Sequence, residues 1–252
     1  MGHEGRCQQD WALALNCILL GPERRSKSVL EEIVGATDGG AEVIAQIAVG
    51  RVRTFLSQSL MDYHAMDPHL GLMDAFSSSL VRPLRLAMLC QRSLPTLIEV
   101  LNLINNDDTL ASSPQTNCIV NSYSSIIEAL QSVNGATWIS QALDAGLLSA
   151  LLKSGARLQE LLPLVRDSIC KDLFKVLHQY LPYRSVLRSV TRALQKVDRL
   201  NLTAEAVGPL WNAWKQFHGA AMVKLIFKEE FDQKYPSAVS AVMIGCMNTK
   251  VK

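Results

Sequence analysis

The amino-acid sequence predicts an all-α protein built from many short helices. Apolar residues recur at intervals of three and four along most of the chain, which is the period of a helix with one buried face. No sustained alternation of apolar and polar residues, the pattern of a half-buried strand, accompanies them. Of the 252 residues, 48% are hydrophobic, which is enough for a folded core and argues against general disorder.

Successive segments show the helical period. We expect helices within residues 23–35, 41–60 and 94–104, where the apolar side chains fall on one face. The clearest amphipathic pattern covers residues 183–200. Its apolar positions are Val186, Leu187, Val190, Ala193, Leu194, Val197 and Leu200.

Glycine and proline pairs predict where these helices stop and start. Asp67-Pro68 and Leu181-Pro182 are two such points, since an interior proline removes a helix hydrogen bond. The polar stretch 105–117 predicts a longer loop, which would divide a helical domain of residues 1–245 only softly. About a dozen helices joined by short turns remain.

Residues 138–155 resemble an armadillo repeat. Gly146 would let the chain reverse between two helices, because glycine adopts positive φ without steric cost. The leucines that follow would be buried against a neighbouring repeat; they are Leu147, Leu148, Leu151 and Leu152. We therefore expect an irregular armadillo/HEAT-like α-solenoid of stacked short helices.

The carboxyl end resembles a second family. Residues 210–214, Leu-Trp-Asn-Ala-Trp, precede an apolar stretch at 222–227 and then Cys246-Met247-Asn248. This order is similar to the helical region that leads into the finger of fungal MYND-type zinc-finger proteins, whose finger begins Cys-x-Asn-x-x-Cys. The resemblance implies that residues 246–252 are the remnant of a finger start. Zinc would then belong to the full-length family, and this chain would hold no cofactor, because Val251 occupies the second ligand position and Cys246 is the only matching finger ligand.

The cysteines and apolar runs indicate an intracellular protein, either cytoplasmic or nuclear. The six cysteines form no Cys-x-x-Cys pair, which excludes a complete zinc module or a thioredoxin-like site and favours reduced thiols. No apolar run approaches the roughly 20 residues that a spanning helix needs, so we expect no membrane partner.

Charge is distributed unevenly between the two parts of the chain. Residues 1–150 carry a net charge of −6, whereas residues 151–252 carry +8. Within the basic part, cations recur every fourth residue and would form a stripe along one helix face; they are Arg184, Arg188, Arg192 and Lys196. We expect this basic stripe to bind an acidic segment of a protein partner. The alternative is that the acidic part of the chain neutralises the stripe internally.

Two groups of residues resemble reactive sites without meeting their spacing. His64 and His69, with Asp62, Asp67 and Asp74 nearby, do not have the spacing of a helical metal-ligand pair. We expect them to lie in a surface loop and to hold no metal.

Cys170 and His178 are eight residues apart, or about 12 Å along a helix, which is too far for a nucleophile and its base. We expect a core cysteine. Since no catalytic motif occurs, the sequence favours a non-catalytic helical-repeat scaffold that binds a protein partner. The alternatives are an enzyme with a dispersed active site, or a weak nucleic-acid binder. Nucleic-acid binding is disfavoured because no aromatic residues alternate with the basic ones.

Overall fold

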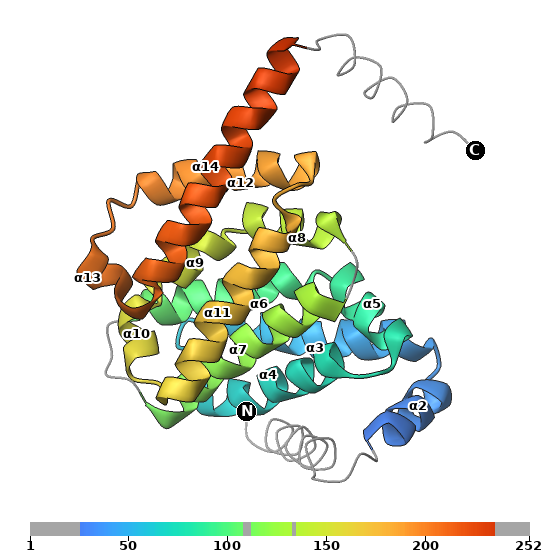
Figure 1. The fold of residues 1–252 in the computed structure, drawn as a ribbon. Helices are drawn as coiled ribbons and strands as arrows, with labels where there is room; N and C mark the ends of the chain where they lie inside the picture. Colours follow the sequence, from blue (N-terminus) through green and yellow to red (C-terminus); the bar gives the residue numbers. More distant parts are fainter. Residues whose placement is uncertain (1–25, 108–111, 133–134, 235–252) are drawn as a thin grey trace.

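A computed structural model describes residues 26–107, 112–132 and 135–234 (Figure 1). All regular structure in these ranges is helical, which confirms the predicted all-α class. The helices are α2 (Ser26–Ala36), α3 (Gly40–Leu56), α4 (Tyr63–Ser78), α5 (Arg82–Cys90), α6 (Ser93–Asn105), α7 (Ser113–Ser132), α8 (Ala136–Asp144), α9 (Leu147–Lys153), α10 (Gly155–Gln159), α11 (Pro163–Tyr180), α12 (Arg184–Asp198), α13 (Ala204–Val207), a 3₁₀ turn (Gly208–Leu210) and α14 (Trp211–Lys234).

The helices pack in two rows that follow the order of the chain. In the first row α4 contacts α7, α7 contacts α11, and α11 contacts α14. In the second row α3 contacts α6, α6 contacts α9, and α9 contacts α12. Figure 1 shows the resulting progression from α3 and α4, low in the picture, to α12 and α14 at the top. Helices outside the rows also cover them, since α5 contacts α3 and α8 contacts α12.

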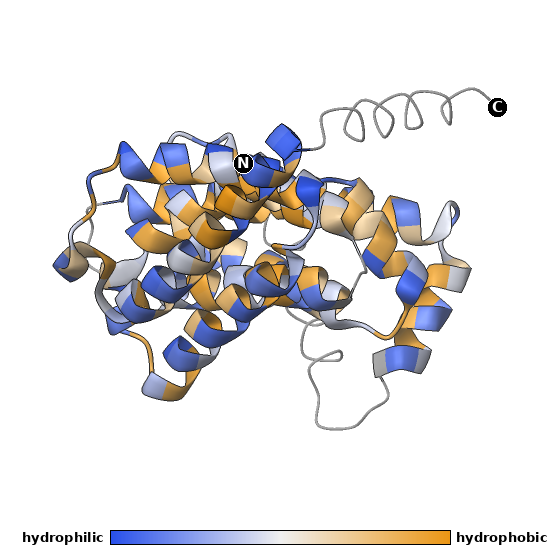
Figure 2. Cartoon of the chain, turned by 45° about the horizontal axis from the view of Figure 1, so that its top comes forward, coloured by the Kyte–Doolittle hydropathy of each residue, from blue (hydrophilic) through white to orange (hydrophobic). Residues whose placement is uncertain are grey.

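The core runs continuously between the rows. Along α4, Met66, Leu70 and Met73 have no exposed surface, and Tyr123 and Ile126 of α7 are equally buried. Hydrophobic and hydrophilic stretches alternate along each ribbon in Figure 2, as expected for helices with one buried face. Burying a side chain of this size contributes about 1.5–3 kcal/mol.

The armadillo-like segment forms the predicted helix–turn–helix. Gly146 has a φ of 101° and separates α8 from α9, so a side chain at this position would be strained. All four leucines that the pattern placed in the core are fully buried. They are Leu147, Leu148, Leu151 and Leu152.

A buried hydrogen-bond network joins three helices beside this turn. The Ser154 hydroxyl lies 2.7 Å from the Tyr123 hydroxyl and donates to the Asn105 side-chain oxygen at 3.0 Å. Asn105 in turn donates to the backbone carbonyl of Ala150 at 2.8 Å.

The loop expected at 105–117 is shorter in the structure. Helix α6 ends at Asn105 and α7 begins at Ser113, so both helices extend into the expected range. The soft division there stays a prediction.

The helix stop expected at Asp67-Pro68 is wrong, because Pro68 lies inside α4. The helix begins earlier, at Tyr63, and Asp62 caps it: the Asp62 carboxylate accepts a hydrogen bond from the Ala65 amide at 2.9 Å. Pro68 cannot donate to the carbonyl of His64, a loss of about 3 kcal/mol in a helix interior. Burial of the α4 side chains against α7 offsets this cost, and no local sequence signal reports that contact.

The α4–α7 interface also contains a half-buried carboxyl. The Ser125 hydroxyl lies 3.5 Å from an oxygen of Asp74. Burial raises the pKa of Asp74 above its ordinary value of 3.8, and the nearby Glu128 carboxylate adds to the rise. Hydrogen bonds from Ser124 and Ser125 act in the opposite direction. The folded protein therefore holds a proton on Asp74 more tightly than the unfolded chain does.

Replacing Leu148 by Asp should destabilise the protein by about 4 kcal/mol or more, because it places an unpaired charge in the core and removes a buried side chain. Lys153→Asp introduces the same residue at an exposed position of the same helix, and should cost about 1 kcal/mol or less. Thermal denaturation followed by circular dichroism measures both. Equal melting temperatures for the two variants would contradict the buried position of Leu148.

Asp74→Asn should stabilise the protein at pH 7. As the pH rises above 3.8, Asp74 loses its proton more readily in the unfolded chain than in the folded protein, because its pKa is raised on folding. The free energy of unfolding of the wild type therefore falls as the pH rises towards 7. The side chain of the Asp74→Asn variant does not ionise, so the variant escapes this loss. Urea denaturation at pH 7 and at about pH 3, below the ordinary pKa of aspartate, measures the difference. The gain should vanish at the lower pH, and Asp38→Asn, at an exposed position, should show no gain at either.

Candidate partner-binding site

The basic stripe lies on α12 with the spacing that the sequence predicts. Arg188, Arg192 and Lys196 are exposed, and Arg184, at the start of the helix, is half-buried. The opposite face of α12 is buried through the apolar residues named above, except for the partly exposed Leu200 just beyond the helix. The structure therefore confirms the amphipathic helix, while the role of its cations in binding stays a prediction.

Two cations of the stripe contact the end of α8. The Arg192 guanidinium donates to both carboxylate oxygens of Asp144, at 2.8 and 2.9 Å, and Lys196 donates to the Asp144 backbone carbonyl at 3.2 Å. Cations are favourable at a helix C-terminus, where carbonyl groups lack helical partners. Both side chains of the Arg192–Asp144 pair are exposed, so it contributes about 1 kcal/mol or less. The acidic part of the chain thus pairs with this half of the stripe.

The other half of the stripe faces α14. Arg184 pairs with Asp232, and its guanidinium carbon lies 5.1 Å from the centroid of the Phe231 ring. Lys228 donates to the second oxygen of Asp232 at 2.8 Å. This hydrogen bond, with the positive charges of Lys228, Arg184 and Arg188, holds the pKa of Asp232 below its usual value. Asp232 is therefore ionised at neutral pH and fixes Arg184 against α14.

A hollow of about 300 Å³ opens where the start of α12 meets α14; we call it the upper hollow. Phe227 and Phe231 are large apolar side chains that remain 61% and 46% exposed there, which is unusual for phenylalanine. Arg188 is exposed on the adjoining turn of α12, where its charge acts on Asp232 without a hydrogen bond to any described residue. The residues lining the upper hollow are Leu181, Pro182, Arg184, Leu187, Lys224, Phe227, Lys228 and Phe231.

A second hollow of about 500 Å³, the lower hollow, lies between α11 and α14. Its α14 residues, Ala213, Gln216 and Phe217, share a helix face with Lys224, Phe227 and Phe231 of the upper hollow, because they recur at three- and four-residue spacing. The other residues lining it are Cys170, Lys171, Phe174, Lys175, His178 and Gln179. The two hollows therefore follow one face of α14, and together we call them the α14 groove.

The α14 groove is basic, aromatic and long. Its two hollows lie along α14 from Ala213 to Phe231, a stretch of about 27 Å at the helical rise of 1.5 Å per residue. No aspartate or glutamate lines either hollow, whereas five cations do. They are Lys171, Lys175, Arg184, Lys224 and Lys228. The sequence identified Arg184 alone among these, although the four-residue spacing of Lys224 and Lys228, and of Phe227 and Phe231, was visible in it.

Cys170 and His178 both line the lower hollow. Burial raises the pKa of the Cys170 thiol to about 11, so that it stays protonated at neutral pH and is a poor nucleophile. Cys170 is buried, as expected of a core cysteine. The hollow thus offers an apolar floor with cations at its edge.

The two histidines expected in a surface loop lie in α4, so that prediction is wrong. Five residues apart on a helix, His64 and His69 point about 140° away from each other. The His69 ring packs 5.4 Å from that of Phe55, and burial, together with the charge of Arg51, lowers its pKa. Within the described ranges, no group of three or more His, Cys, Asp or Glu side chains is placed to hold a metal ion.

The remaining predictions concern the carboxyl tail, membrane spanning and the family of the chain. Cys246 and the tail 246–252 lie outside the described residues. None of the helices in the described part of the chain is both long and apolar enough to cross a membrane. No protein family, curated protein or solved structure matches the chain.

We expect the purified chain to contain no stoichiometric zinc, because Cys246 is the only residue that matches a ligand of the MYND finger, and structural zinc needs four ligands. Elemental analysis of protein dialysed without chelator measures the metal content. About one zinc per chain, lost in a Cys246→Ser variant, would show that Cys246 belongs to a ligand set that the finger pattern does not describe.

Proposed function

We propose that the chain is a non-catalytic helical scaffold that binds an acidic segment of a protein partner along the α14 groove. The observation that carries this proposal is the combination, along one face of α14, of two exposed phenylalanines with five lining cations, of which only Arg184 and Lys228 pair with a carboxylate of a described residue, that of Asp232. Exposed aromatic rings beside cations are typical of interaction sites.

The chemistry of the groove favours a segment that carries both acidic and apolar side chains. Phe227 and Phe231 would bury their rings against apolar residues of the partner, which supplies most of the affinity. Carboxylates of the partner would meet Lys224 and the exposed Arg188, each such contact contributing about 1 kcal/mol or less. Binding would therefore be salt-sensitive while its strength depends on the aromatic contacts.

We further propose that the two rows of helices are irregular armadillo-like repeats. Several features support this: corresponding helices contact each other in chain order, α8 and α9 form the predicted helical hairpin, and α14 continues the row of α4, α7 and α11. Such stacks commonly bind extended partners along a row of helices, and the α14 groove lies along one. The resemblance of residues 200–248 to MYND-type proteins supports an origin as the helical body of an intracellular member of that family.

The test is binding of a fluorescent peptide of about 18 residues, with leucine and glutamate placed on opposite faces of a helix. Arg188→Glu combined with Lys224→Glu should weaken binding roughly tenfold at physiological salt, because both cations are exposed, Lys224 lines the upper hollow, and Arg188 lies one turn along α12 from Arg184, which also lines it. The matched control, Arg192→Glu combined with Lys196→Glu, makes the same charge change on the same face of α12. It should change affinity by less than about threefold, since these cations already contact Asp144.

Fluorescence anisotropy gives the affinities, and circular dichroism checks that each variant remains folded. Phe227→Ser should weaken binding without changing its salt dependence. Equal losses in the two charge-reversed variants would mean that net charge alone attracts the peptide, and would contradict a site at the upper hollow.

A further inference from the structure

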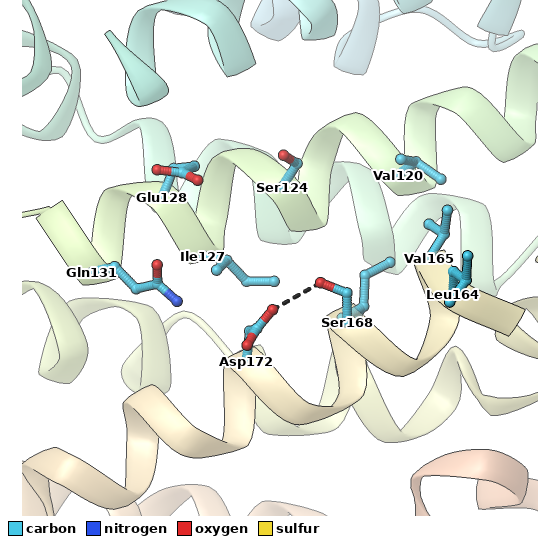
Figure 3. A pocket seen from close by; sticks show the side chains of 10 residues that line it. Val120, Ser124, Ile127, Glu128, Gln131, Leu164, Val165, Ser168 and Asp172 are labelled. Atoms are coloured by element: carbon cyan, nitrogen blue, oxygen red, sulfur yellow. Dashed lines mark hydrogen bonds between the residues drawn. The ribbon is translucent and has the colours of Figure 1, made fainter. Parts of the chain in front are cut away.

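A separate groove of opposite charge lies between α7 and α11. It has a volume of about 390 Å³, and Figure 3 shows side chains from both helices projecting into it. Its apolar residues come from both walls, and they are Val120, Ile127, Leu164, Val165 and Ile169. Its polar residues are Ser124, Glu128, Gln131, Ser168 and Asp172. We call it the acidic groove.

The charged residues that line the acidic groove are all acidic. Glu128 on α7 and Asp172 on α11 are the only ionisable residues that line it, and no lysine or arginine does. Asp172 accepts a hydrogen bond from the Ser168 hydroxyl at 2.7 Å, drawn in Figure 3, and neither carboxylate forms an ion pair with a described residue. Asp74 lies behind α7, close enough to Glu128 for their charges to interact. An incoming cation would therefore meet carboxylates from both walls.

The apolar part of the acidic groove is incompletely covered. Leu164 is 87% exposed and lines one end, and Leu162, just before α11, is 74% exposed. Elsewhere in α11, Ile169, Leu173 and Phe174 are buried. Exposed leucines next to a hollow and next to unpaired carboxylates define a surface complementary to a segment with an apolar face and flanking cations.

We propose that the acidic groove binds a cationic amphipathic helix from a protein partner. A helix lying between α7 and α11 would cover Leu164 with its apolar side, as neighbouring helices cover one another throughout the core. Its lysines or arginines would pair with Glu128 and Asp172. This partner differs in charge from the one that suits the α14 groove, so the two sites would not compete, and this proposal does not depend on the proposed function.

The probe is a fluorescent peptide of about 14 residues, four helical turns, with leucines on one face and lysines on the other. Glu128→Gln combined with Asp172→Asn removes both charges, while the new amide can still accept the Ser168 hydrogen bond. This double variant should bind roughly tenfold more weakly at physiological salt. The matched control, Glu31→Gln combined with Glu32→Gln, removes two exposed carboxylates of α2 and should bind within about twofold of the wild type.

A third variant, Leu164→Ser, tests the apolar contact and should also weaken binding, with an unchanged salt dependence. No binding by the wild type, or equal affinities for both double variants, would overturn the proposal. Analytical ultracentrifugation measures whether the chain self-associates, that is, whether a second copy of the chain occupies the groove. Self-association that Leu164→Ser abolishes, without a change in peptide affinity, would also overturn it.

Discussion

The structure depends on one constraint: none of the helices described for this chain can cover its own apolar face. α9 spans only Leu147–Lys153, yet four of its leucines are fully buried, and α12 buries seven residues while its other face is polar. Helices this short are unstable alone, so their stability comes from packing against neighbours. The two-row order satisfies this requirement, because each apolar face meets helices from other parts of the chain, as α4 meets α7 and α12 meets α8.

The same constraint explains which parts of the fold the sequence predicts. Periodicity located α3, α6 and α12 because the buried face of a helix is encoded within the helix itself. The prediction of a helix boundary failed at Pro68, because the decisive contact of that helix is with α7, some fifty residues further along the chain. Punctuation by proline reports local backbone preference, and tertiary burial overrode that preference in α4.

The candidate site was only partly predictable for a related reason. The spacing of the basic stripe identified its four cations, but it could not show that Arg192 meets Asp144, 48 residues away, whereas Arg184 meets α14. The α14 groove likewise arises between helices, so Lys224 and Phe227 acquire their setting only when α14 packs on α11 and α12. With Glu128 and Asp172 in the acidic groove, the folded chain separates surfaces of opposite charge that the sequence shows only as an overall imbalance.

The uneven burial of α14 has a consequence for how the upper hollow forms. Its buried residues, Trp214, Phe217 and Ala221, all lie in the first half of the helix, and its last turns project beyond the other described helices in Figure 1. In the second half, Leu225 packs against the core only in part, and Arg184 contacts Asp232 and Phe231. Detaching these turns costs far less than unfolding the body, so hydrogen exchange would divide α14 into a slow half and a fast half. The proposed ligand of the upper hollow would therefore select the docked population, and its apparent affinity would scale with that fraction.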